Sequence, residues 1–188
     1  MTKKLIKFLL FIFFTITLIF LYLSVFGIST QIFNKKIKKE ILNINKKINL
    51  ELKSVRILIN PFNFSANIKT IDPEIIFNNK NIKLNYINTN VSFKSLINQK
   101  IKIDDLKIST KKNKIKDIVS LTRLFNDNTE LFLLEKIIKR GFLTGEINLN
   151  LDEDGKIKKD YSIKGFINNG SLSLLRKNSI KNLNLDFK

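Results

Sequence analysis

The chain contains neither cysteine nor histidine. Because cysteine is absent, the fold cannot rely on disulfides, and thiolate chemistry is excluded. The absence of histidine removes the commonest general base and the commonest metal ligand. The sequence also has no phosphate loop, dinucleotide fingerprint, zinc-binding pattern or catalytic-triad motif. We therefore predict that the protein is not an enzyme and has no catalytic residues, no metal site and no cofactor.

Acidic residues are scarce as well: 16 Asp and Glu stand against 34 Lys and Arg, which gives a net charge of +18. A charge of this size favours anionic partners. However, only four of the basic residues are Arg, and the abundant Lys, Asn, Ile and Phe share A/T-rich codons. A biased genome produces this composition without any selection for binding. The usual RNA-binding motifs are missing, so we expect no nucleic-acid partner.

Two acidic motifs are interpreted as features of the backbone. Asp152–Gly155 resembles the start of a calcium loop but lacks the later ligands, so we predict a hairpin turn there. Asp104 and Asp105 have the spacing of a carboxylate pair, but no histidine supports them. An exposed strand bulge is therefore expected at this position, not acid–base chemistry.

An uncharged, apolar run of 21 residues extends from Phe8 to Ile28. As a helix it reaches about 31 Å, the thickness of the apolar core of a bilayer. The alternative is a cleaved signal peptide with a weak site at Val25–Gly27, but the run is longer than the usual apolar region of such peptides. We predict that residues 1–30 form a cytoplasmic tip and an uncleaved transmembrane signal-anchor. Lysines lie on both sides of the run, so their count does not settle its orientation; the position at the extreme N-terminus predicts a cytoplasmic N-terminus.

Residues 31–47 show the periodicity of an amphipathic helix. Apolar residues recur at steps of three and four from Phe33 to Ile48, and lysines occupy the opposite face. The helix either lies at anionic lipid headgroups or caps the following sheet. The candidate headgroup contacts are Lys35, Lys36, Lys38 and Lys39.

Alternating strands are predicted over residues 48–112 and 142–188, on either side of a helical insert over 113–141. A phase shift near Lys53-Ser54 indicates a bulge. In the insert, Asp127 and Glu130 resemble a capping box before the second helix, and Gly141 is placed as its stop. The final alternating strand is expected to be truncated, so we interpret the chain as a fragment of a longer protein.

Three segments carry a resemblance to a known family: Ile48–Ile75, Ile82–Ser109 and Gly145–Leu174. After the anchor and the amphipathic helix, they repeat a rhythm of strand, short link and strand. The chain thereby resembles the N-terminal portion of the AsmA-like family, the AsmA/TamB/YhdP group of Gram-negative envelope proteins. The resemblance implies an elongated, twisted antiparallel sheet forming a U-shaped trough, anchored in the bacterial inner membrane with its bulk in the periplasm.

The resemblance also implies a function, namely movement of phospholipid towards the outer membrane along the apolar inside of the trough, in envelope biogenesis. The expected partners are phospholipid acyl chains and headgroups, with other envelope proteins. The alternative is an anchored scaffold for envelope assembly that carries no lipid, in which the same residues form an ordinary core. The residues expected on the inward face, from their alternation, are Ile57, Ile59, Phe64, Ile68, Leu84, Tyr86, Val91, Phe93, Ile101, Ile103, Ile147, Leu149, Leu151, Ile163, Leu172, Leu174, Leu183 and Leu185.

Overall fold

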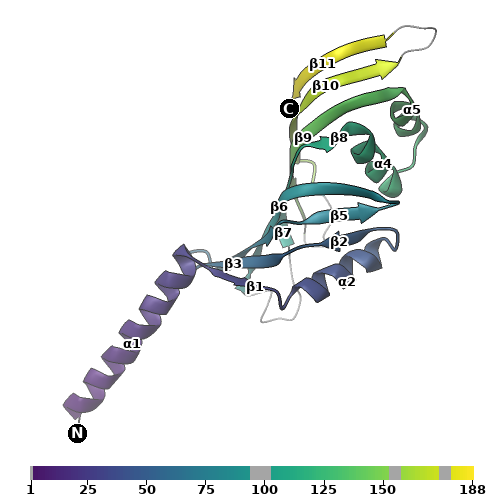
Figure 1. Cartoon of the computed structure of the whole chain (residues 1–188). Coiled ribbons are helices and arrows are strands. Elements are labelled where there is room, and N and C mark those ends of the chain that lie inside the picture. Colours follow the sequence, from purple (N-terminus) through teal and green to yellow (C-terminus); the bar gives the residue numbers. More distant parts are fainter. Residues whose placement is uncertain (1, 94–102, 153–157, 174–178) are drawn as a thin grey trace.

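A computed structural model describes residues 2–93, 103–152, 158–173 and 179–188. Among these residues the chain forms an N-terminal apolar helix followed by a mainly antiparallel sheet with three further helices (Figure 1). The elements are α1 (Thr2–Val25), β1 (Ile28–Thr30), α2 (Asn34–Ile44), β2 (Asn49–Glu51), β3 (Ser54–Asn60), β4 (Ser65–Ile71), β5 (Glu74–Phe77), β6 (Lys80–Ser92), β7 (Ile103–Thr110), β8 (Asn113–Lys114), α4 (Ile115–Phe125), α5 (Thr129–Ile137), β9 (Ile138–Asn150), β10 (Ser162–Ser173) and β11 (Ser179–Phe187).

Helix α1 projects away from the sheet (Figure 1), and its segment Lys3–Val25 is long and apolar enough to cross a membrane. The predicted apolar run continued to Ile28, but the helix ends at Val25. Gly27 adopts a φ of +66°, which stops the helix, and Ile28 then pairs with Ile57 of β3. A Cβ atom at Gly27 would lie 2.5 Å from the carbonyl oxygen of Ile57. Glycine therefore lets α1 join directly onto the first strands.

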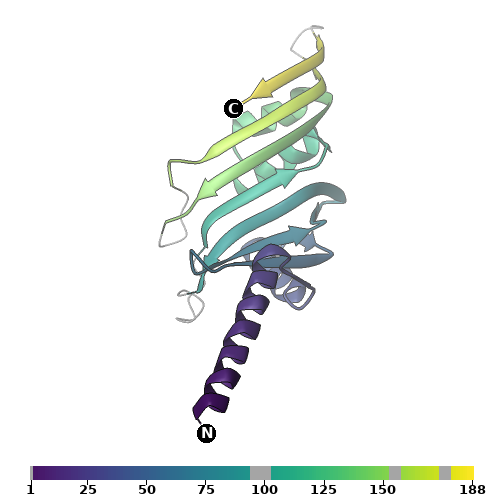
Figure 2. The same ribbon diagram turned by 90° about the vertical axis from the view of Figure 1, so that its left-hand side faces the viewer.

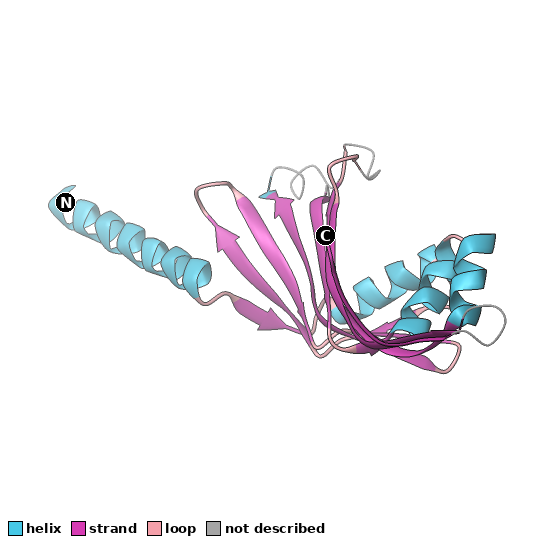
Figure 3. Ribbon diagram, turned by 90° about the horizontal axis from the view of Figure 1, so that it is seen from above, coloured by secondary structure: helices cyan, strands magenta, loops and turns pink. Residues whose placement is uncertain are grey.

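The sheet has 11 strands, and its main path runs β1-β3-β4-β6-β7-β9-β10-β11. Every pairing is antiparallel, β2 and β5 extend the sheet beside β6, and β8 pairs with β9. Figure 2 shows the long strands β6 to β11 stacked one after another away from α1. Seen from above, the sheet bends, with the helices that follow α1 inside the bend (Figure 3).

The two irregularities predicted in the strands have different outcomes in the structure. The phase shift near Lys53 is not a bulge: β2 ends at Glu51 and pairs with β5, whereas β3 starts at Ser54 and pairs with β4. The chain therefore changes its partner strand there. By contrast, the irregularity expected at Asp105 is present, because the register between β6 and β7 shifts between Asn90 and Val91.

The ends of α5 also differ from the prediction. Asn128 caps the helix, with its Oδ1 accepting from the backbone N–H of Leu131 at 2.8 Å. The preceding Asp127 instead pairs with Arg123. The helix stops at Ile137 and leads straight into β9, so Gly141 is a strand residue. It is needed for close packing, because a Cβ there would lie 2.6 Å from the Ile115 side chain and 2.9 Å from Gly170.

Helices α2 and α4 pack on the same face of the sheet. A fully buried cluster of Ile48, Phe77, Ile82 and Leu84 receives Ile41 from α2 and, from α4, Ile118, Leu121 and Leu124. A second cluster around Val55 also packs against α2, through Ile37 and Ile41. The third cluster consists of Ile115, Val119 and Ile138, where α4 meets β9. The hydrophobic core thus lies between these helices and one face of the sheet.

Candidate functional site

Cross-strand pairs place apolar residues next to each other on one face of the sheet. One row begins at Ile28, directly after α1, and proceeds through consecutive pairs to Ile57, Ile68, Thr89, Leu106 and Leu149. Thr89 is its single polar member, and its hydroxyl donates to the backbone carbonyl of Asp105 at 2.7 Å. A second row consists of Ile87, Ile108, Ile147 and Ile163. We call this side the apolar face.

The helices cover only part of the apolar face. Leu143, Ile167 and Leu172 pack against the cluster of α4 and β9, and Leu84 is 2% exposed beneath α4. Toward the ends of the strands that lie nearest α1, no described helix packs on this face. There Ile103 is 36% exposed and Ile163 43%, and on the outer strand β11 Leu185, which pairs with Ile167, is 46% exposed. We call this part the uncovered strip, and its members are Ile59, Ile103, Leu106, Ile147, Leu149, Ile163 and Leu185.

The opposite face is mainly polar and internally hydrogen-bonded. Asn67 Nδ2 donates to Asn90 Oδ1 at 2.8 Å, and Asn90 Nδ2 donates to Asp105 Oδ1 at 3.0 Å, which links three strands. Glu146 accepts from Lys164, and this contact lowers the pKa of the Glu146 carboxyl. The two faces of the same strands therefore differ sharply in polarity, as expected for a sheet with one face in water.

The predicted inward residues divide into several groups. Those that lie on the apolar face are Ile57, Ile59, Ile68, Leu84, Val91, Ile103, Ile147, Leu149, Ile163, Leu172, Leu183 and Leu185. Leu151 forms an isolated bridge beyond β9, and Phe93 lies just after β6. Ile101 and Leu174 lie outside the described residues. Of the first group, Leu84 and Leu172 are part of the core under α4, Val91 is buried, and Ile57 and Ile68 pack against the cluster around Val55.

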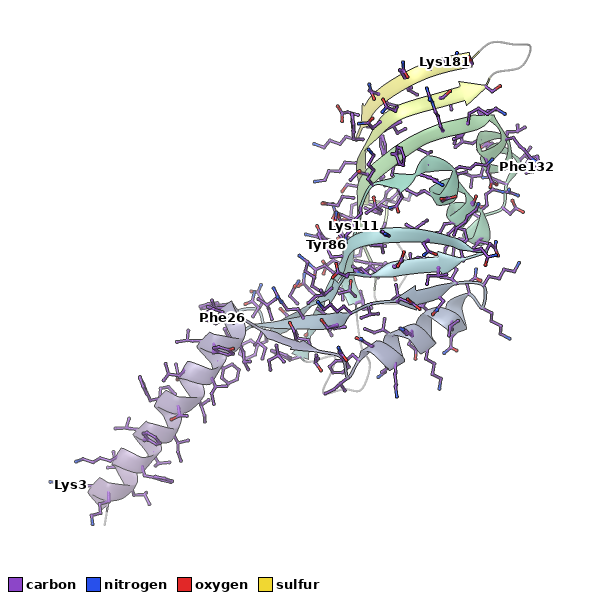
Figure 4. All side chains as sticks on the ribbon, viewed as in Figure 1. Lys3, Phe26, Tyr86, Lys111, Phe132 and Lys181 are labelled. Atoms are coloured by element: carbon purple, nitrogen blue, oxygen red, sulfur yellow. The ribbon has the colours of Figure 1, made fainter. Side chains whose placement is uncertain are left out.

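Tyr86 and Phe64 are not on the apolar face. The register between β6 and β7 shifts after Leu84, so Tyr86 pairs with Ser109 on the polar face. Lys69 lies 4.3 Å above its ring, and its hydroxyl is 3.4 Å from Glu146. Figure 4 shows Tyr86 on the side of the sheet turned away from α5, which carries Phe132. Phe64 lies in the turn between β3 and β4 with a φ of +44°, outside both strands.

Several residues of the apolar face were absent from the predicted set. Ile87 takes the place expected for Tyr86, because the register shift moves the alternation by one residue. Leu106 and Ile108 were predicted to be strand residues, and their i, i+2 spacing was the available signal. Gly165, which pairs with Gly145, leaves room for the Phe187 ring, since a Cβ on Gly165 would lie 2.6 Å from it. Sequence alternation cannot reveal such a contact.

The lysines of α2 lie on its solvent side. Lys35, Lys36 and Lys39 are exposed and Lys38 is half-buried, whereas Ile37 and Ile41 contact the clusters under the sheet. The structure thus confirms that the helix caps the sheet. Contact of its lysines with headgroups stays a prediction.

An ionic cluster joins α4, α5 and the start of β6. Glu135 of α5 accepts from the Ser120 hydroxyl and from Arg123 of α4, and Lys80 lies 3.8 Å from its carboxylate. These contacts, the Ser120 hydrogen bond first, lower the pKa of the Glu135 carboxyl from its ordinary 4.5. The cluster holds the two helices together over the sheet.

The lowered pKa predicts that this helix pair loosens in acid. A carboxyl with a depressed folded-state pKa stabilises the fold above 4.5, and that stabilisation is lost as the pH falls through the depressed value. We expect Glu135→Gln to cost about 1–2 kcal/mol of unfolding free energy at pH 7, because charge-assisted hydrogen bonds are lost. Urea titrations of both proteins from pH 7 to pH 3 measure this difference. The difference should shrink with falling pH, and a constant difference would contradict the assignment.

No group of three or more Asp or Glu residues that could hold a metal ion occurs among the described residues. A depression near the ends of β9 and β10 is lined by Arg140, Gly141, Phe142, Asn169 and Asn182. It combines one cation with amides and an aromatic ring, without a carboxylate or hydroxyl to act as base or nucleophile. The apolar face is therefore the most extensive functional candidate in the described part of the chain.

Comparisons with known proteins give no relatives for this chain: no protein-family model, curated protein or solved structure matches it. The chemistry of the apolar face and its position beside α1 are therefore the basis for a functional assignment.

Proposed function

We propose that the protein is an AsmA-like lipid conduit, anchored by α1 in the bacterial inner membrane with the sheet in the periplasm. In this proposal the bent sheet forms the wall of a U-shaped trough. Helices α4 and α5 form an insert that occupies part of the trough. The uncovered strip contacts the acyl chains of phospholipid on their way toward the outer membrane. The observation that carries the proposal is the continuity of apolar cross-strand pairs from Ile28, where α1 ends, across successive strands.

The free energies agree with such a role. Removing each CH₂ group from water contributes about 0.8 kcal/mol, so a 16-carbon chain crossing water alone faces a cost on the order of 12 kcal/mol. An apolar track that stays in contact with the acyl chain lowers this barrier, and no covalent bond has to form or break. The polar, hydrogen-bonded opposite face keeps the other side of the sheet soluble.

The dimensions of the sheet support a place at one end of a conduit. The main path has eight strands, and at about 4.8 Å between neighbours they advance about 34 Å. This distance is close to the thickness of one bilayer core and much less than the separation of two membranes. We assign the described strands to the membrane-proximal entrance of the conduit.

Photo-crosslinking in membranes tests the proposal. A photoreactive side chain at Ile103, Leu149 or Ile163 of the uncovered strip should capture phospholipid, because these side chains are partly accessible. The matched controls are Lys107 and Ser162 on the polar face, which should capture little. A probe at the buried Phe77 should capture only protein, since the ring is 2% exposed. Equal lipid labelling on both faces would refute the conduit, and protein adducts alone at the strip would favour the scaffold.

A further inference from the structure

The turn between β3 and β4 carries two aromatic rings without any packing. Phe62 is 92% exposed and Phe64 is 74% exposed. The turn residues Asn60–Ser65 include no charged side chain, although 27% of the chain is charged. Exposed aromatic rings gain nothing from folding in water, whereas aromatic residues are enriched where a protein meets the membrane–water interface. The turn therefore presents two aromatic rings to whatever lies beside it outside the sheet.

The fold places this turn beside the end of the membrane helix. Strand β1 leads away from α1, and β3 runs antiparallel to it, so β3 returns toward α1. Its last residues pass Ile28 and contact α1 before the turn begins. Figure 2 shows the β3–β4 turn next to the C-terminal end of α1. Figure 1 also shows the link between β1 and α2 on the side of the sheet from which α1 leaves, and this link carries Ile32, 83% exposed.

Part of the backbone of the turn is hydrogen-bonded within the protein. Asn60 Oδ1 accepts from the N–H groups of Phe62 and Asn63 at 3.1 and 3.2 Å. The N–H of Phe93 donates to the Phe64 carbonyl at 2.8 Å, and Pro61 has no N–H to satisfy. A segment that enters the apolar boundary of a bilayer must satisfy its backbone groups internally. Phe64 adopts a φ of +44°, in the left-handed region that residues with a side chain rarely occupy.

We propose that the β3–β4 turn inserts Phe62 and Phe64 into the interface of the same bilayer that α1 spans. The turn then forms a second contact with the membrane and fixes the tilt of the sheet relative to α1. It also holds Ile59, the first residue of the uncovered strip, at the lipid surface. This inference depends on the proposal that α1 is a membrane span, but it does not depend on lipid transport.

Tryptophan fluorescence of the full chain in vesicles tests the insertion, because the natural sequence contains no Trp. Single Trp residues are introduced as F62W in the turn, F14W in the middle of α1 and F125W at the end of α4. Phe125 is the matched control, since it is 60% exposed and lies far from α1. We expect F62W to emit at shorter wavelength than F125W. Phospholipids brominated near the headgroup should quench F62W more than deeply brominated ones, and F14W should show the reverse order.

The outcomes separate this inference from the proposed function. If F14W is quenched while F62W behaves like F125W, the turn stays in water and the insertion is wrong. If F62W is blue-shifted but unquenched by brominated lipid, its partner is a protein, and the insertion is equally wrong. Absence of quenching at F14W would overturn the membrane span itself. Because Phe62 is 92% exposed, its replacement leaves the fold intact, and F64W provides an independent second probe of the same turn.

Discussion

Replacing Phe77 by alanine should lower the free energy of unfolding by about 3–5 kcal/mol, the usual cost of emptying a buried aromatic site. Phe77 ends β5, is 2% exposed and belongs to the cluster that receives Ile41 from α2 and Leu121 from α4. Its ring therefore supports two helices and the sheet together. Urea unfolding in mild detergent, followed by the sheet signal in circular dichroism, measures the loss, while α1 remains in the micelle.

Phe125→Ala is the control for this experiment. It removes the same ring from a side chain that is 60% exposed, so we expect a change within about 0.5 kcal/mol. Similar losses in both variants would mean that Phe77 does not lie in a closed core. The helices would then be held over the sheet chiefly by the ionic cluster around Glu135.

The strands were largely predictable because alternation is a local signal. Ile57, Ile59 and Ile68 follow a period of two and do lie on the apolar face. In the hairpin from β5 to β6, Asn78 and Asn79 both adopt positive φ, as a two-residue turn requires, and asparagine tolerates this conformation. For these residues, the alternation in the sequence and the strand pairing in the sheet assign each side chain to the same face.

The errors occur where a strand changes its partner. Strand β6 pairs with β5 at its start and with β4 at its end, and the register against β7 slips between Leu84 and Tyr86. One slip reverses the face of every later residue, which is why Tyr86 was assigned wrongly. The same kind of change separates β2 from β3. Partner exchange depends on long-range pairing, so a local phase shift such as the one near Lys53 does not distinguish it from a bulge.

The position of the helices over the sheet was not predictable either. The buried Asn113 of β8, just before α4, fixes it in part: its Oδ1 accepts from the Lys83 N–H at 2.9 Å, and its Nδ2 donates to the Lys83 and Lys111 carbonyls at 2.8 Å. In a chain so rich in asparagine, one structural amide is indistinguishable from the others. This helix position decides which apolar residues are core and which form the uncovered strip.

A charge placed on the uncovered strip should interrupt lipid passage beyond it. Ile163 on β10 is 43% exposed and pairs with Ile147, so Ile163→Asp puts a carboxylate among apolar side chains without emptying the core. Bringing an acyl chain past this group either desolvates the charge or breaks contact with the track, and both cost several kcal/mol. Photo-crosslinking of lipid at Leu185 on β11 should therefore fall by about tenfold or more, which corresponds to at least about 1.4 kcal/mol. Crosslinking at Ile103 on β7, on the α1 side of the change, should persist.

Ser162→Asp is the matched control, because it adds the same charge one residue earlier on the polar face. Its carboxylate lies beside Asn148, whose Nδ2 already donates to the Ser162 hydroxyl at 3.1 Å. Lipid capture at Leu185 should then equal the capture measured in the protein without either substitution. If Ile163→Asp leaves capture at Leu185 unchanged, lipid reaches β11 by another route and the strip is not the track. If Ser162→Asp reduces capture equally, the net charge of the sheet and not the apolar face governs access. A loss of capture at Leu185 with Ile163→Asp alone would identify the apolar face as the lipid path. The path would then start at the membrane and follow the strand order from β7 to β11.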